Sequence, residues 1–125
     1  MISKLEAKNE NLVKDKSFDF ALLIIDCYKY LSSKNEYVLS KQLLRSGTSI
    51  GANIEEAQAS QSRKDFLSKM SIASKEARET LYWIKLLVKS EFLDEYQGTN
   101  ELVEEINSVI NILTKIVKTV SSTTK

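Results

Sequence analysis

The chain of 125 residues contains no proline and no histidine, and it has only one cysteine and three glycines. Proline is the strongest helix breaker, so its absence favours long, uninterrupted helices. Without histidine the chain lacks both the usual general base at neutral pH and the most common metal ligand. The single Cys27 cannot form an internal disulfide, and its place in an apolar helical pattern predicts an inert, buried thiol.

Long hydrophobic runs and a charge excess are missing as well. The longest apolar run, residues 20–25, is far shorter than the roughly 20 residues that cross a bilayer. The first residues have no apolar core of signal-peptide length. Eighteen basic and 17 acidic residues give a net charge of +1, so no overall field draws the chain to nucleic acid or to an anionic membrane. We therefore expect a soluble, cytoplasmic protein with no membrane partner.

The chain does contain a regular helical pattern. Apolar residues recur at intervals of three and four over four segments, which are approximately residues 13–33, 39–60, 62–93 and 101–121. The third segment opens with Ser62 and Asp65, which resemble a capping box. Short polar breaks separate the four segments. The pattern predicts an all-α fold, an antiparallel up-down-up-down four-helix bundle.

The bundle is expected to form one domain over residues 13–121. We expect residues 1–12 to be a flexible or frayed N-terminal segment, and residues 122–125 to be a C-terminal tail.

Two glycines stand one helical turn apart in the sequence RSGTSIGANIEEA, residues 45–57. A phosphate-binding loop is not indicated, because no Lys-Ser or Lys-Thr pair follows and no strand precedes. Gly47 and Gly51 instead predict the close approach of a neighbouring helix, for which Ala73 and Ala77 offer a matching row of small residues. A local kink is the alternative.

The second helix also has a polar side, formed by Arg45, Ser49, Asn53 and Glu56. Arg45 and Glu56 are about 16 Å apart along the axis, so they cannot pair with each other. This side is either solvated or in contact with another surface.

The third helix has a second face, mixed apolar and acidic, apart from its core stripe. An additional apolar face implies an additional contact, which is either self-association or a broader core within one chain. If the helix self-associates, Glu76 or Glu79 is expected to form an ion pair with Arg45 of a neighbouring subunit. The predicted oligomer interface comprises Arg45, Asn53, Glu56, Ile72, Glu76, Glu79, Trp83 and Leu86.

A third face of the same helix is basic and contains no acidic residue. It extends over about 37 Å, long enough to follow several phosphates. An aromatic ring in its middle is suited to stacking on a base. The alternative is a lysine-rich surface that only confers solubility. The candidate nucleic-acid-binding residues, called here the basic stripe, are Lys64, Lys75, Arg78, Tyr82, Lys85 and Lys89.

Nothing in the chain points to catalysis. Glu76 and Glu79 are three residues apart, but the Glu-x-x-His pattern of di-iron bundles is absent. We expect no enzyme, no catalytic or metal-binding residue and no cofactor.

Taken together, RSGTSIGANIEEA, SRKDF, IASKEARETLYWIKLL and the closing amphipathic helix resemble the 23S rRNA intervening-sequence proteins over about residues 10–120. The resemblance implies a four-helix bundle that assembles into homopentamers. The family is related to the accessory protein of diversity-generating retroelements. This relation implies RNA or DNA as a partner, together with a reverse transcriptase or other protein. The expected function is a non-enzymatic oligomeric scaffold that binds nucleic acid through the third helix. The alternative is a protein-interaction adaptor with no nucleic-acid role.

Overall fold

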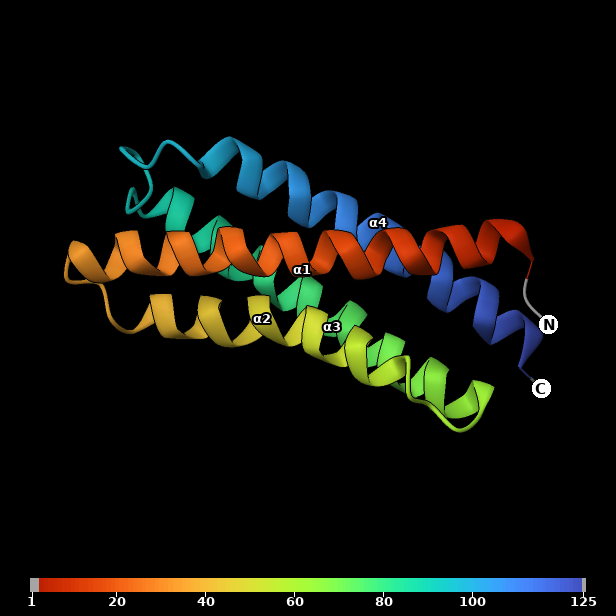
Figure 1. Cartoon of the computed structure of the whole chain (residues 1–125). Coiled ribbons are helices and arrows are strands. Elements are labelled where there is room, and N and C mark those ends of the chain that lie inside the picture. Colours follow the sequence, from red (N-terminus) through yellow and green to blue (C-terminus); the bar gives the residue numbers. More distant parts are fainter. Residues whose placement is uncertain (1–2, 125) are drawn as a thin grey trace.

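The computed structural model describes residues 3–124. Within that range the chain forms four helices and no strand, which are α1 (Lys4–Ser33), α2 (Leu39–Ala57), α3 (Arg63–Lys89) and α4 (Thr99–Thr123). They pack side by side as a bundle (Figure 1). The predicted all-α class and the four-helix bundle are confirmed.

The helices surround one core in a four-sided arrangement. α1 and α3 each pack along both α2 and α4, whereas the backbones of α1 and α3 do not come close to each other within the described residues. α1 and α3 are therefore diagonal to each other. Both termini and the α2–α3 connection lie at one end of the bundle, and the other two connections lie at the opposite end (Figure 1).

The first helix begins nine residues earlier than its apolar pattern predicted. The hydroxyl of Ser3 accepts a hydrogen bond from the backbone N–H of Glu6 at 3.1 Å and caps α1. The expected flexible or frayed segment, residues 1–12, is thus helical from Lys4 onward, while residues 1–2 lie outside the described residues. At the other end, α4 extends to Thr123 into the predicted tail, whose residue 125 also lies outside the described range.

The α2 and α3 helices begin close to where the sequence indicates. At α2 the carboxylate of Glu36 accepts hydrogen bonds from three successive backbone N–H groups, those of residues 38–40. At α3 the Ser62 hydroxyl accepts from the backbone N–H of Asp65 at 3.0 Å, and the Asp65 carboxylate accepts from the Gln61 N–H at 3.4 Å. The capping function predicted for Ser62 is confirmed.

The connection between α3 and α4 contains the third glycine of the chain. Gly98 precedes α4 with a φ of −84°, a conformation that any residue adopts. The positive φ in this connection is at Glu91, at 71°. The chain turns within the predicted region without using the freedom of its glycine.

The core is built from the predicted apolar stripes. Each helix buries one stripe, and the larger side chains that are fully buried are Phe20, Ile24, Leu31, Leu43, Ile50, Ile54, Met70, Ile84, Leu87, Leu102, Ile106 and Leu113. Cys27 is buried among them, and burial raises the pKa of its thiol to about 12. The prediction of a buried cysteine is confirmed.

Gly47 and Gly51 do permit close helix packing, but against a different helix. A Cβ at Gly47 would lie 2.6 Å from Cγ1 of Ile24, and one at Gly51 would lie 3.4 Å from the backbone oxygen of Ser17. Both neighbours belong to α1. The expected match with Ala73 and Ala77 of α3 is therefore wrong, because both glycines face α1.

Candidate functional site on helix α3

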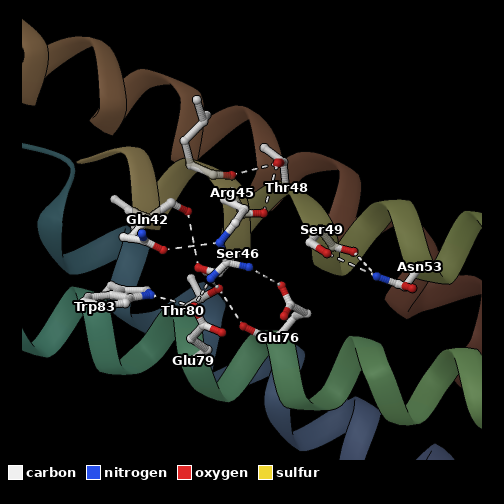
Figure 2. A network of polar contacts seen from close by, with 12 residues as sticks. Gln42, Arg45, Ser46, Thr48, Ser49, Asn53, Glu76, Glu79, Thr80 and Trp83 are labelled. Carbon is white, nitrogen blue, oxygen red and sulfur yellow. Dashed lines mark hydrogen bonds and ion pairs between the residues drawn. The ribbon is translucent and has the colours of Figure 1, made fainter. Parts of the chain in front are cut away.

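The flank of α3 that faces α2 carries a cluster of polar contacts (Figure 2). The guanidinium of Arg45 donates from Nη1 to Glu76 Oε2 at 3.2 Å and from Nη2 to Glu79 Oε2. It also donates from Nε to Gln42 Oε1 at 3.3 Å. The indole N–H of Trp83 donates to the same Glu79 oxygen at 2.9 Å.

This cluster contains the pairing expected between subunits, but inside one chain. Glu76 and Glu79 were the predicted partners of Arg45, and both contact it, yet all three belong to the same molecule. The physical reason is that α2 and α3 pack directly against each other. Trp83 is half-buried and packs against the core.

Beneath the charged cluster lies a buried pair of hydroxyls that sequence reasoning missed. The Oγ atoms of Ser46 and Thr80 are hydrogen-bonded at 2.9 Å, and the Thr80 hydroxyl also bonds to the Glu76 backbone oxygen at 2.7 Å. Both residues are fully buried. The only signal in the sequence was a serine and a threonine at core-facing positions of two neighbouring helices.

The remaining polar residues of the predicted interface also have partners within the chain. The amide nitrogen of Asn53 donates to the Ser49 backbone oxygen at 2.9 Å. The carboxylate of Glu56 accepts from Lys69 Nζ at 2.9 Å, and this hydrogen bond raises the pKa of Lys69. Ile72 and Leu86 differ, because both are exposed.

The basic stripe lies on the outward side of α3. Its six residues, from Lys64 to Lys89, are all exposed. Among the described residues none of its five cations pairs with a carboxylate. Arg78 donates from Nη2 to the hydroxyl of Thr114 on α4 at 3.2 Å. Tyr82 is 55% exposed and meets the Trp83 ring edge to face, with ring centroids 5.2 Å apart.

Helix α4 extends this surface. Lys118, one turn beyond Thr114, adds an exposed cation on the same side. Further along, α3 and α4 form a small groove of about 290 Å³ with an apolar floor and a polar rim, lined by Leu81, Ile84, Lys85, Val88, Lys89, Val103 and Asn107. Sequence reasoning missed the groove, because it depends on which faces of two helices meet.

The described residues contain neither a cluster suited to a metal ion nor a helix suited to a membrane. No group of three or more Cys, Asp or Glu side chains is placed to hold a metal ion. No helix there is long and apolar enough to cross a membrane.

The molecule is thus a four-helix bundle in which one helix, α3, has both an internally paired flank and an outward face of unpaired cations. Over residues 9–115 the chain matches the 23S rRNA-intervening sequence protein family. It belongs to that family. The resemblance seen in its motifs is confirmed.

A solved structure agrees with this assignment. The chain is similar to a protein with unknown function of the S23 ribosomal protein family from Bacteroides thetaiotaomicron, known from a crystal structure. The two are 46% identical with a TM-score of 0.82, over 88% of this chain and 98% of the other. None of the curated proteins compared matches the chain.

Proposed function

We propose that the protein is a non-enzymatic, self-associating scaffold that binds nucleic acid through the basic stripe of α3. The observation that carries the proposal is the outward face of α3, where five exposed cations have no carboxylate partner among the described residues. When lysine and arginine side chains neutralise phosphates, the counterions condensed on the nucleic acid are released, and this release is the main source of affinity for nucleic acid. The exposed ring of Tyr82 adds a surface on which a base stacks.

The self-association follows from exposed apolar side chains on the same helix. Ile72 and Leu86 are exposed, and a second apolar face on a surface helix favours a contact. The assembly we propose is the homopentamer that the family resemblance implies. An antiparallel up-down order of the helices is also part of the proposal, supported by the positions of the three connections in Figure 1.

Light scattering at micromolar concentration tests the assembly. We expect a mass near five times the 14.2 kDa of the chain. A mass of one chain would contradict self-association, and another multiple would contradict only the pentamer.

A binding series with a labelled, structured RNA tests the nucleic-acid role. Affinity should fall steeply as salt rises, with a slope of log K against log salt of about −3 to −5 if four or five phosphates are contacted. The double variant Lys64→Gln with Lys75→Gln removes two of these cations, so its slope should be shallower by about 2. A flat response, or no binding at low salt, would remove this role.

The adaptor alternative is favoured by one observation, the groove between α3 and α4. The apolar floor of this groove suits the apolar side chains of an acidic amphipathic segment, and Lys85 and Lys89 suit its acidic side chains. A pull-down with and without nuclease separates the two functions. A protein partner that is retained after nuclease treatment and lost on Val88→Asp supports the adaptor, whereas loss on nuclease treatment supports the nucleic-acid role.

A further inference from the structure

The outward face of α1 is an unusual surface for a helix that packs in a bundle. Phe18 is 66% exposed and Leu22, one turn later, is 50% exposed. Three exposed carboxylates, those of Asp15, Asp19 and Asp26, accompany them, and none forms an ion pair among the described residues. These five residues are called here the α1 face. Exposed Lys14 and Lys29 border this surface. Large apolar groups beside charges without a partner are typical of a docking surface.

The outward face of α3 carries the complementary chemistry. Tyr82 is 55% exposed and Leu86 is 36% exposed. Three cations, Arg78, Lys85 and Lys89, lie beside them without a carboxylate partner among the described residues. These five residues are called here the α3 face. Each face therefore joins two large apolar side chains to three charges, and the charges of the two faces are opposite.

The bundle places the two faces where one molecule can meet the next. Because α1 and α3 are diagonal, their outward faces point away from each other. Both helices begin at the end of the bundle that holds the termini (Figure 1). A second copy set beside the first in the same orientation thus brings its α1 parallel to the α3 of the first.

The axial spacing of the charges matches in this parallel arrangement. Asp15 and Asp26 are eleven residues apart, and so are Arg78 and Lys89, which is about 16 Å along either helix. If the two helices are aligned so that Asp15 lies at the same height as Arg78, then Asp26 lies at the same height as Lys89. Asp19 then lies between Arg78 and Lys85 in height, within reach of both long side chains.

The apolar residues meet in the same register. Phe18 becomes level with residue 81 and Leu22 with residue 85, so both lie beside Tyr82 and Leu86. Phe18 also borders a groove of about 370 Å³ between α1 and α2, which is open because Gly51 and neighbouring small residues line it. An aromatic or aliphatic side chain of the facing helix would fill this space.

The flanks of the α1 face are sorted by chemistry. Lys16 of α1 pairs with Glu105 of α4 at 3.2 Å, and Asp19 follows it by three residues, so the acidic flank turns toward α4. Phe18 lines the groove against α2, so the apolar flank turns toward α2.

The flanks of the α3 face are sorted in the same way. Arg78 reaches Thr114 of α4, and Lys85 and Lys89 line the groove against α4. Leu86 follows Trp83, which joins the cluster with α2, by three residues. In two copies of the same orientation, acidic therefore meets basic on the α4 side and apolar meets apolar on the α2 side.

We infer that the α1 face of one molecule docks in parallel on the α3 face of a second copy. The inference rests on the proposed self-association and names its surfaces. Since the two faces differ, the contact is head-to-tail, and it forms a ring when successive rotations close. It also covers Arg78, Lys85 and Lys89, so phosphates compete with the three aspartates for these cations, while Lys64 lies below the level of Lys4, where the facing α1 begins.

Charge reversal followed by light scattering at micromolar concentration tests the contact. The acidic-side variant carries Asp15→Lys with Asp26→Lys, and the basic-side variant carries Arg78→Asp with Lys89→Asp. We expect each to fall to the mass of one chain, because like charges then face each other. All four substitutions in one chain should restore the mass of the unmodified protein, since every pair is opposite again.

The two one-sided variants separate the head-to-tail contact from its symmetric alternatives. A contact of α1 with α1 would be unaffected by the basic-side variant, and a contact of α3 with α3 would be unaffected by the acidic-side variant. Circular dichroism checks that each variant is folded, and Phe18→Ala should reduce the mass without any change of charge. An unmodified protein of one-chain mass would overturn self-association altogether. An unmodified oligomer whose size survives both charge reversals would overturn only the α1–α3 contact.

Discussion

The two sides of α3 differ in how their polar groups are satisfied. On the side facing α2, Arg45, Glu76, Glu79 and Trp83 form one connected cluster within the chain. On the outward side, the cations of the basic stripe have no carboxylate partner among the described residues. Both sides carry charged residues in the sequence, so charge alone does not distinguish a side that stabilises the fold from one that is available to partners.

The largest effect should come from the buried hydroxyl pair beneath the inner cluster. Thr80→Val keeps the shape of the side chain but removes its hydrogen bond to the buried Ser46 hydroxyl, which retains only a 3.5 Å bond to the Leu43 backbone oxygen. The free energy of unfolding should fall by about 1–3 kcal/mol. Lys64→Ala on the outward side, outside the proposed subunit contact, should change it by less than about 0.5 kcal/mol. Urea denaturation measures both. Equal losses would show that the two sides contribute alike to stability.

A similar test applies to the close approach of α2 to α1 beside this cluster. Gly47→Ala forces a methyl group against the fully buried Ile24 and should cost about 1–2 kcal/mol after the gain in helix propensity. Gly51→Ala meets only ordinary contacts and should be neutral or stabilising by up to about 1 kcal/mol. Thermal unfolding of the pair gives the comparison. A destabilised Gly51→Ala would mean that both glycines are required for packing.

Removal of one cation from each side should have a smaller and unequal effect. Arg45→Met breaks contacts to two carboxylates, and because half of the Arg45 side chain is exposed the loss should be about 1 kcal/mol. Lys64→Met, which lies outside the proposed subunit contact, breaks no ion pair among the described residues and should leave stability unchanged within about 0.5 kcal/mol. The measurement is chemical denaturation at low salt. A loss at Lys64 as large as at Arg45 would reveal a partner for Lys64 in solution.

The effect that is absent at neutral pH concerns the titration of Cys27, away from both sides of α3. Its folded pKa is raised from the ordinary 9.0 to about 12 by burial. Between these values the unfolded chain loses a proton that the folded protein keeps, so stability should fall as pH rises through this range and be unaffected below it. Melting temperatures at pH 8 and 10.5, compared with those of Cys27→Ala, isolate the contribution. A folded thiol that reacts readily with Ellman's reagent at pH 8 would contradict burial.

The sequence allowed the fold to be predicted because the information was local. The intervals of three and four in each apolar stripe and the Ser62 cap follow from neighbouring residues in one helix. The early start of α1 was missed because its first turns have weak apolar periodicity. They are held instead by the Ser3 cap and by a contact of Glu6 with Arg63 of α3 at 3.6 Å.

For the candidate site, the sequence allowed us to predict which residue types share a helix face, but not which surfaces meet. Helical phase separated the basic stripe from the acidic flank, and it named Glu76 and Glu79 as partners of Arg45. It could not show that the partners belong to the same chain, nor that Gly47 faces Ile24 rather than Ala73. Such facts depend on which helices are neighbours, and helical phase within one helix carries no information about that.

The most direct test of the functional division of α3 compares two substitutions that each remove one positive charge. Lys64→Gln changes the outward side beyond the proposed subunit contact, and Arg45→Gln changes the inner cluster. In RNA binding over a salt series, Lys64→Gln should weaken affinity and lower the steepness of the salt dependence by about 1, while Arg45→Gln should leave both unchanged. Equal effects of the two substitutions, or an effect of Arg45→Gln alone, would contradict the assignment of nucleic-acid binding to the outward side.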